Sequence, residues 1–382
     1  MSSIVDSAIA LRPLLRASGP EIESGARLTA DVFDALSDMD AFRLQLGADY
    51  GGPAASPIDY LKVIEELSRG DASSGWCAMV GSESVACINA FLEPETVRKM
   101  LAAGPKSTAA FTVVGAGTAI ETAEGYLASG RWRFASGCRH AQWLASLCVV
   151  HDENGPRTRD NGAPLTRVIF VRREDAILHD TWTVSGLRGT ASDDFEIRDM
   201  KIPLEQSFDL AAPPVDPGMA WRIPVVLRLA MSKAAAVCGI ARGAMDALVP
   251  MLERKPFAGA VPAREEPRFQ LMLAQAEGAL EGGRAYLYQN IDVAWQTVLR
   301  GEPLTIDEVA RVRLAIATAA QRALEALHLM QEIAGTSAVL DPTFDRHARD
   351  FEVARHHMQL QSHVVEDVGR VLLGMQPRNP MF

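Results

Sequence analysis

The chain has 382 residues, of which 48% are hydrophobic and 23% charged, so it is long and apolar enough for a large core or for two or three packed parts. Its formal net charge of −10 excludes the basic surface that nucleic-acid binding requires. The N-terminal stretch lacks a secretory leader pattern, and we find no stretch with the apolar length of a membrane span. We therefore expect a cytoplasmic protein with neither a nucleic-acid nor a membrane partner.

The five cysteines are odd in number, widely spaced and without a CxxC pair, which favours buried thiols over a disulfide framework or a zinc site. They are Cys77, Cys87, Cys138, Cys148 and Cys238.

Residues 1–106 form the first predicted domain, which is helical. Gly51 and Gly52 interrupt the helical pattern, and Ser56 with Pro57 begins a new amphipathic run. Residues 107–210 form a predicted β domain, because short runs rich in β-branched and aromatic residues follow one another there. Within it, the alternation on either side of Ser129-Gly130 predicts a hairpin at that dipeptide.

Residues 220–382 form the third predicted domain, with helices expected at 224–252, 268–299, 307–334 and 344–373. Thr305 and Glu308 have the spacing of a capping box, and Gly335 marks the end of the same helix. Four helices of similar length predict a bundle. The fold class is therefore α+β, mainly α, with a helical N-terminal domain, a β-barrel-like middle domain and a C-terminal four-helix bundle.

Common catalytic motifs are absent from the sequence. GAGTAI at residue 115 starts like a dinucleotide fingerprint but has Ile120 at the place of the third glycine. The four histidines near the C-terminus are not three or four residues apart, so no helix-borne metal pair is predicted.

Five further segments carry recognisable patterns: FTVVGAGT (111–118), RWRFASGCRHAQW (131–143), WTVSGLRGTASDDFEIRDMKIP (182–203), ERKPFAG (253–259) and QEIAGTS (331–337). Together these segments resemble the acyl-CoA dehydrogenase fold family, and the resemblance covers most of the chain. The family has the three-domain fold predicted above, assembles as a homotetramer and binds flavin between its domains.

The resemblance implies two groups of flavin-binding residues. The first segment matches a strand and turn beside the flavin ring, and the second places Ser136 and Gly137 at the ring's reactive edge. The last two segments match those that reach a neighbouring subunit's flavin. The implied cofactor-binding residues are Phe111, Thr112, Gly117, Thr118, Ser136, Gly137, Arg254, Phe257, Gln331 and Gly335.

Departures from the dehydrogenases decide between the chemistries of the family. Many dehydrogenases have a catalytic Glu at the position that Met358 occupies here, counted from Arg349-Asp350, and a thioether cannot abstract a proton. The segments DASSGW from Asp71 and SGxxHxxW from Ser136 are more similar to the flavin monooxygenases of this fold, which receive reduced flavin from a separate reductase.

In those monooxygenases, a histidine at the place of His357 faces the flavin and the oxygen site. Helical spacing also puts His357 on the inward face with Ala354, Val364 and Val368. The resemblance therefore implies that His357 and Ser136 are catalytic and that His140 and Met358 line the substrate pocket. Arg349-Asp350 is interpreted as a structural ion pair.

The implied reaction uses reduced FAD or FMN and O2, through a flavin C4a-hydroperoxide in a dry pocket, to hydroxylate a small aromatic or heteroaromatic substrate. The implied partner is a flavin reductase. Two alternatives remain open at this point: an acyl-CoA dehydrogenase with a relocated base, and a flavin-free interaction protein of the same fold. His357 could also be a core residue, and His140 could cap a strand.

Overall fold

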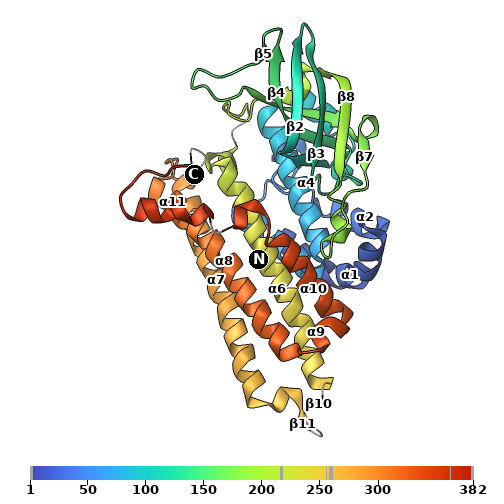
Figure 1. The fold of residues 1–382 in the computed structure, drawn as a ribbon, viewed down its shortest axis with the longest axis vertical. Helices are drawn as coiled ribbons and strands as arrows, with labels where there is room; N and C mark the ends of the chain where they lie inside the picture. Colours follow the sequence, from blue (N-terminus) through green and yellow to red (C-terminus); the bar gives the residue numbers. More distant parts are fainter. Residues whose placement is uncertain (1–2, 216–217, 255, 258–260, 362, 380–382) are drawn as a thin grey trace.

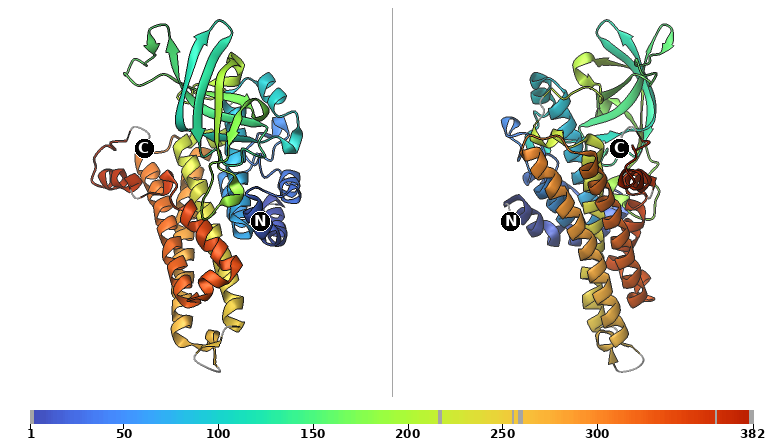
Figure 2. Two further views of the ribbon diagram at one scale, coloured as in Figure 1. Left: turned by 45° about the vertical axis from the view of Figure 1, so that its right-hand side comes forward. Right: turned by 90° about the vertical axis from the view of Figure 1, so that its left-hand side faces the viewer.

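The computed structural model describes residues 3–215, 218–254, 256–257, 261–361 and 363–379. Figure 1 shows a strongly twisted sheet at one end of a long helical bundle, with the N-terminal helices beside both. The two views of Figure 2 confirm that the sheet lies at one end of the bundle and the short pair of β10 (Pro256–Phe257) and β11 (Val261–Pro262) at the other. The predicted fold class is confirmed. Along the chain, helices come first, the strands of the sheet follow, and the helices of the bundle come last.

The N-terminal helices carry local signals that fix their starts. They are α1 (Ser3–Gly25), α2 (Ala30–Asp38), α3 (Pro57–Gly70), α4 (Ala72–Phe91) and α5 (Pro94–Met100). Ser56 caps α3 as predicted, since its side chain accepts a hydrogen bond from the Asp59 amide. Asp71 caps α4 in the same way through the Ser74 amide. Almost every side chain of α4 is buried, which makes α4 the central helix between this part and the sheet.

The sheet contains β1 (Ala109–Thr112), β2 (Val114–Thr122), β3 (Gly125–Arg133), β4 (Trp143–Asp152), β5 (Gly155–Pro156), β6 (Thr166–Arg172), β7 (Ile177–His179), β8 (Asp194–Pro203) and β9 (Ser207–Phe208). Its strand order is β7-β8-β3-β2-β4-β6-β9, an open path, and β1 and β5 both pair with β4. β1 and β2 pair with β4 in parallel, one after the other, so they form a single line of strand that is interrupted only at Val113.

The predicted hairpin at Ser129-Gly130 is wrong. Both residues lie inside β3, and the turn is at Ala123-Glu124, where β2 passes into β3. Gly130 instead faces Gly117 across the two strands, and a Cβ on Gly130 would lie 2.6 Å from the Gly117 Cα. These glycines therefore mark a close backbone approach and not a change of direction.

The bundle consists of α6 (Val225–Arg254), α7 (Pro267–Leu299), α8 (Ile306–Ala334), α9 (Ser337–Leu340), α10 (Pro342–Ala354) and α11 (His363–Leu372). The capping box of Thr305 and Glu308 is present at the start of α8, and Gly335 ends that helix with φ 56°. The predicted helix over 344–373 is wrong, because α10 stops at Ala354 and a short 3-10 turn, η8 (Met358–Leu360), precedes α11.

The five cysteines are free and buried, as predicted. Within the described residues, one helix is long and apolar enough to cross a membrane, a segment the sequence expectation overlooked. It spans Val225–Glu253, and 72% of its most apolar window is buried inside the protein. The packing of α3, α8 and α10 around α6 accounts for its apolar composition.

Gly117 offers a test of the sheet packing. A Cβ there would lie 2.1 Å from Cζ2 of Trp132, so we expect Gly117→Ala to lower the free energy of unfolding by about 1–3 kcal/mol through overpacking. Gly369 of α11 is the matched control, since nothing lies within 4 Å of a Cβ placed on it and alanine favours its helix. Urea unfolding without added flavin measures both. A Gly117→Ala protein as stable as the wild type would contradict this packing.

Candidate active site

Ser136 and Gly137 lie in a tight turn directly after β3. Phe134, two residues earlier, has φ 62°, a left-handed conformation that is costly for an aromatic residue and is typical of functional sites. The turn is held by backbone hydrogen bonds to the segment before β8: the Ala135 amide donates to Asp193 and the Gly137 amide to Thr190, the latter at 2.7 Å. The backbone of the turn is thus fixed by a segment more than 50 residues away.

A chain of buried hydroxyl groups begins at Ser136. Its Oγ is 2.7 Å from the Oγ of Ser192, which is 2.7 Å from Oγ1 of Thr190. Thr190 donates to the carbonyl oxygen of Leu187 at 2.8 Å. On the other side, Nε1 of Trp76 in α4 donates to Ser136 at 3.3 Å.

His357 contacts the same tryptophan. The rings of His357 and Trp76 meet edge to face, with their centroids 5.8 Å apart. Trp76 therefore contacts both residues that the sequence assigned to catalysis, although Ser136 and His357 are 221 positions apart. The structure brings these two predicted residues to one place.

His357 reaches this place from a turn and not from the helix that the sequence predicted. It is the N-cap of η8, and its Nδ1 accepts a hydrogen bond from the Gln359 amide at 3.3 Å. Such a local bond between side chain and backbone competes with helix continuation, which explains the break after Ala354. The predicted alignment of His357 with Val368 is therefore wrong, because Val368 packs with Ala310 of α8 in a separate cluster. The side chain of Val364 lies outside the described part of the structure.

Burial lowers the pKa of His357 to about 3, and the charge of Lys233 contributes in the same direction. Lys233 is itself buried and paired with Glu83 at 2.5 Å. The imidazole is therefore neutral at physiological pH. Because Nδ1 acts as an acceptor, the single ring proton sits on Nε2, and His357 offers an Nε2–H donor.

Arg349 and Asp350 do not form the ion pair expected from the sequence. Arg349 pairs with Glu23 of α1 and with Asp345, whereas Asp350 turns inward and accepts a hydrogen bond from the Leu187 amide. Burial, with a smaller effect of the Asp71 carboxylate, raises the pKa of Asp350 to about 7. Asp350 thus anchors the residue whose carbonyl ends the hydroxyl chain.

Of the flavin-contacting strand and turn predicted at residues 111–118, the structure contains a strand but not the turn. Phe111 and Thr112 end β1, and the Thr112 hydroxyl donates to the Arg133 carbonyl, which ties β1 to the start of the Ser136 turn. The turn itself is absent, because Gly117 and Thr118 lie inside β2 and pair with β3. The packing of Trp132 on Gly117 is sufficient to explain that glycine, and a flavin contact there stays a prediction.

The second group of predicted flavin residues lies far from Ser136 in this chain. Gln331 and Gly335 stand at the end of α8 next to α9, and Arg254 and Phe257 at the end of α6 and in β10, at the opposite end of the bundle from the sheet (Figure 1). The side chains of Arg254 and Phe257 lie outside the described part of the structure. A single chain does not bring the two groups together.

His140 and Met358 flank the candidate site. Nε2 of His140 is 3.3 Å from the Leu28 carbonyl, its ring stacks on Phe33, and its buried Nδ1 has no partner among the described residues. Burial lowers the pKa of His140, so it too is neutral. Met358, next to His357, is 53% exposed. Their assignment to the substrate pocket stays a prediction.

The residues around Ser136 fit a flat, largely apolar cofactor with polar edges. Gly137 has φ 80°, and a Cβ on it would meet nothing closer than the Cys77 sulfur at 3.9 Å, so the turn is open beside this residue. Three apolar side chains next to predicted site residues are about half exposed and available to cover a ligand: Val113, Phe134 and Met358. Among the described residues no cluster of His, Cys, Asp and Glu could hold a metal ion.

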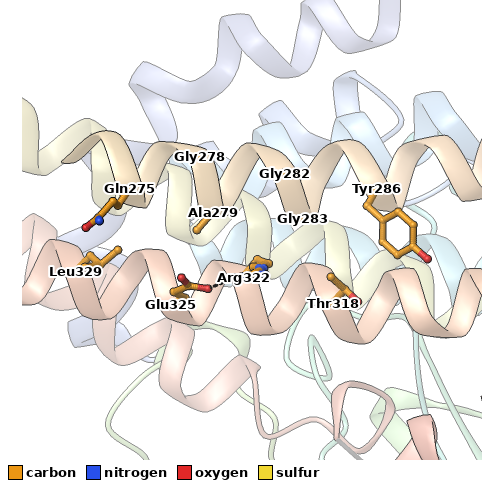
Figure 3. A pocket seen from close by; sticks show the side chains of 10 residues that line it. All are labelled: Gln275, Gly278, Ala279, Gly282, Gly283, Tyr286, Thr318, Arg322, Glu325 and Leu329. Atoms are coloured by element: carbon orange, nitrogen blue, oxygen red, sulfur yellow. Dashed lines mark hydrogen bonds and ion pairs between the residues drawn. The ribbon is translucent and has the colours of Figure 1, made fainter. Parts of the chain in front are cut away.

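Two hollows on the helical surface do not include these residues. One, of about 710 Å³, lies between α7 and α8 and is lined by Gly278, Gly282 and Gly283 together with Arg322 and other side chains (Figure 3). The other, of about 1230 Å³, lies between α1, α3, α6 and α7. Its arginines are paired with carboxylates, for example Arg69 with Asp246 and Arg242 with Glu277.

Comparison with known families identifies the chain. Residues 14–103 match the family described as acyl-CoA dehydrogenase, N-terminal domain, and residues 231–362 match acyl-CoA dehydrogenase, C-terminal domain, which together are more than half of the chain. The chain belongs to the acyl-CoA dehydrogenase family. The resemblance inferred from five short segments is thereby confirmed.

Within this family, the chain is similar in sequence to flavin-dependent oxygenases. Indole-3-acetate monooxygenase of Pseudomonas putida is 28% identical over 95% of this chain and 91% of its own length. The oxygenase component of the FADH2-dependent resorcinol hydroxylase of Rhizobium sp. (strain MTP-10005) is 25% identical over 96% of this chain and 92% of its own. The crystal structure of 3-HSA hydroxylase from Rhodococcus sp. RHA1 has the same fold, with a TM-score of 0.90 and 23% sequence identity. The match covers 100% of this chain and 99% of that protein's chain. The predicted enzyme class, a flavin-dependent monooxygenase, is confirmed by these relatives.

Three contributors to this site were not identified from the sequence. Trp76 was one of several scattered tryptophans, and Thr190 and Ser192 were seen only as part of a family-like segment. No spacing rule links them to Ser136, because they approach it from a different helix and a different loop. A resemblance centred on the turn could not reveal the hydroxyl chain behind it.

The charge state of His357 can be measured directly. We expect the His357 resonance to show no titration between pH 5 and 8. An imidazole whose pKa in the folded state is about 3 stays neutral over this range. NMR of the protein with 13C-labelled histidine measures this, and the His357→Gln spectrum assigns the signal. The low pKa also means that protonation in the unfolded state destabilises the fold as pH falls from about 6.5 toward 3. An inflection near pH 6.5 would contradict the burial of this ring.

Proposed function

We propose that the protein is the oxygenase component of a two-component system and hydroxylates a small aromatic or heteroaromatic substrate with O2 and reduced FAD or FMN. The observation that carries the proposal is the meeting of Ser136 and His357 around Trp76. The names of the relatives, an indole-3-acetate monooxygenase and a resorcinol hydroxylase, support an aromatic substrate. Bound reduced flavin supplies the two electrons with which O2 is activated.

The proposed role of each side chain follows from the hydrogen bonds or protons that it can donate or accept. The neutral His357 donates from Nε2 to the oxygen or to the substrate's polar group and can return a proton there. Ser136 and Gly137 hold the reactive edge of the flavin. The ring of Trp76 and the exposed faces of Phe134 and Met358 exclude water, which keeps activated oxygen from being lost as H2O2.

The partners follow from this chemistry. A separate flavin reductase supplies the reduced flavin, and the cytoplasm, where NAD(P)H is available to it, is the proposed location. We also propose a homotetramer in which Arg254, Phe257, Gln331 and Gly335 reach the flavin of a neighbouring subunit. Support comes from their distance from Ser136 within one chain and from the glycine-lined hollow between α7 and α8, where another helix can approach closely (Figure 3).

The roles of Ser136 and His357 are tested by the coupling of flavin oxidation to hydroxylation. In His357→Ala and in Ser136→Ala, we expect the hydroxylated product per reduced flavin consumed to fall by about 100-fold, the usual effect of losing one positioned hydrogen-bonding group at the reacting centre, with H2O2 released in its place. Anaerobically reduced FAD or FMN, oxygenated buffer and a panel of phenols and indoles supply the assay. Product is measured by chromatography and H2O2 by a peroxidase assay.

His356→Ala is the matched control, since it removes the neighbouring exposed imidazole. Unchanged coupling in both active-site variants would remove His357 and Ser136 from the mechanism. If an acyl-CoA thioester bleaches bound oxidised flavin anaerobically and no phenol or indole is hydroxylated, the protein is a dehydrogenase with a relocated base.

The assembly is tested by sedimentation equilibrium and by flavin affinity. We expect a mass of four chains and, for Arg254→Ala, an increase of about tenfold in the Kd for reduced FAD, comparable to the loss of one charge-assisted hydrogen bond. Arg264→Ala, an exposed arginine just before α7, serves as the control. A monomer that binds reduced FAD with the same Kd in wild type and Arg254→Ala would contradict the shared site.

A further inference from the structure

The loop of residues 186–192 behind the Ser136 turn is held on several sides. The Asp350 carboxylate of α10 accepts the Leu187 amide hydrogen, and the Arg188 side chain donates to the Glu23 carbonyl of α1. A Cβ on Gly186 would lie 2.1 Å from the Arg349 carbonyl oxygen, so only glycine permits this contact with α10. Leu187 has φ 50°, a conformation that persists because these contacts impose it.

The hydrogen bonds of this loop fix the direction of every proton in the hydroxyl chain. The Leu187 carbonyl can only accept, and it accepts from Nε1 of Trp182 and from the Thr190 hydroxyl, each at 2.8 Å, so the single proton of Thr190 is directed toward Leu187. Thr190 can then only accept from Ser192, and Ser192 can only accept from Ser136. The proton of Ser136 therefore points toward Ser192.

The remaining capacity of Ser136 is that of an acceptor. Of its two lone pairs, one receives the Nε1–H of Trp76, and one is left. Ser136 is buried, so an acceptor atom of a ligand placed against it would meet a lone pair without water to intervene. A ligand atom that carries a hydrogen would instead form a hydrogen bond.

The hydrogen-bonding character of the flavin ring at N5 differs between its reduced and oxidised states. N5 carries a hydrogen in the two-electron-reduced ring and is a bare acceptor in the oxidised ring. We propose that Thr190 and Ser192 are positioning residues that commit Ser136 to the acceptor role and so make the site selective for reduced over oxidised flavin. This rests on the proposed function, in which Ser136 lies at the reactive edge of the flavin.

The test compares the affinities of the full-length protein for the two redox states of one flavin. Anaerobic calorimetric titrations with oxidised and with photoreduced FMN, repeated with FAD, give the ratio of Kd for oxidised to Kd for reduced flavin. In Ser192→Ala, the Ser136 proton loses its acceptor and can turn to donate to the oxidised ring. We expect the ratio to fall by about five- to tenfold, mainly because oxidised flavin gains one hydrogen bond.

Thr190→Val provides a second variant, since it keeps the shape of the side chain but removes the acceptor of Ser192, and we expect a change in the same direction. Ser84→Ala is the control: its hydroxyl is also buried, in α4, and donates to the Val80 carbonyl. As an independent readout, the two-electron midpoint potential of the bound flavin should fall by about 30 mV for each tenfold decrease in the ratio.

Two results would overturn the proposal while leaving the proposed function in place. One is a wild-type protein that binds both redox states with equal Kd. The other is an equal loss of affinity for both states in Ser192→Ala and Thr190→Val, which would show that the hydroxyl chain only supports the turn. A wild-type protein that binds neither form of flavin would refute the proposed function together with this inference.

Discussion

The loop of residues 186–192 meets the bundle, the N-terminal helices and the sheet within seven residues, and the position of Ser136 depends on it. Asp350 holds the Leu187 amide, and Thr190 holds the Gly137 amide through its carbonyl oxygen. The loop is thus bonded to α10 near one end and to the Ser136 turn near the other. The site is therefore built at the junction of three parts of one chain, where cofactor sites commonly form.

Burial gives the polar groups of this junction definite roles. The imidazole of His357 is neutral because its charged form would be desolvated next to the Lys233–Glu83 pair. The proton of Ser136 is directed toward Ser192 because of the acceptors behind it. A donor from His357 and an acceptor from Ser136 thus both contact Trp76, an arrangement suited to a cofactor and a substrate that are themselves polar only at their edges.

The departures from the sequence predictions have a common cause. The break after Ala354 arises from a hydrogen bond of the His357 ring with the Gln359 amide, and the glycine at 130 serves a close approach to Gly117. In both cases the residue type was noticed, but its local meaning was misjudged because the contact that decides it lies outside the periodic pattern. Arg349-Asp350 shows the same effect, since each residue is satisfied by a distant partner and not by its neighbour.

The sequence by itself determined the order of helical and β parts, the caps of Ser56 and Thr305, the buried thiols and the family, because periodicity, capping and short motifs depend on neighbours along the chain. It also singled out Ser136 and His357. Only the tertiary structure decided that Trp76 joins them and that Thr190 and Ser192 orient the Ser136 hydroxyl. Hydrogen-bond direction depends on which donors and acceptors meet in space, and no pattern along the chain encodes that meeting.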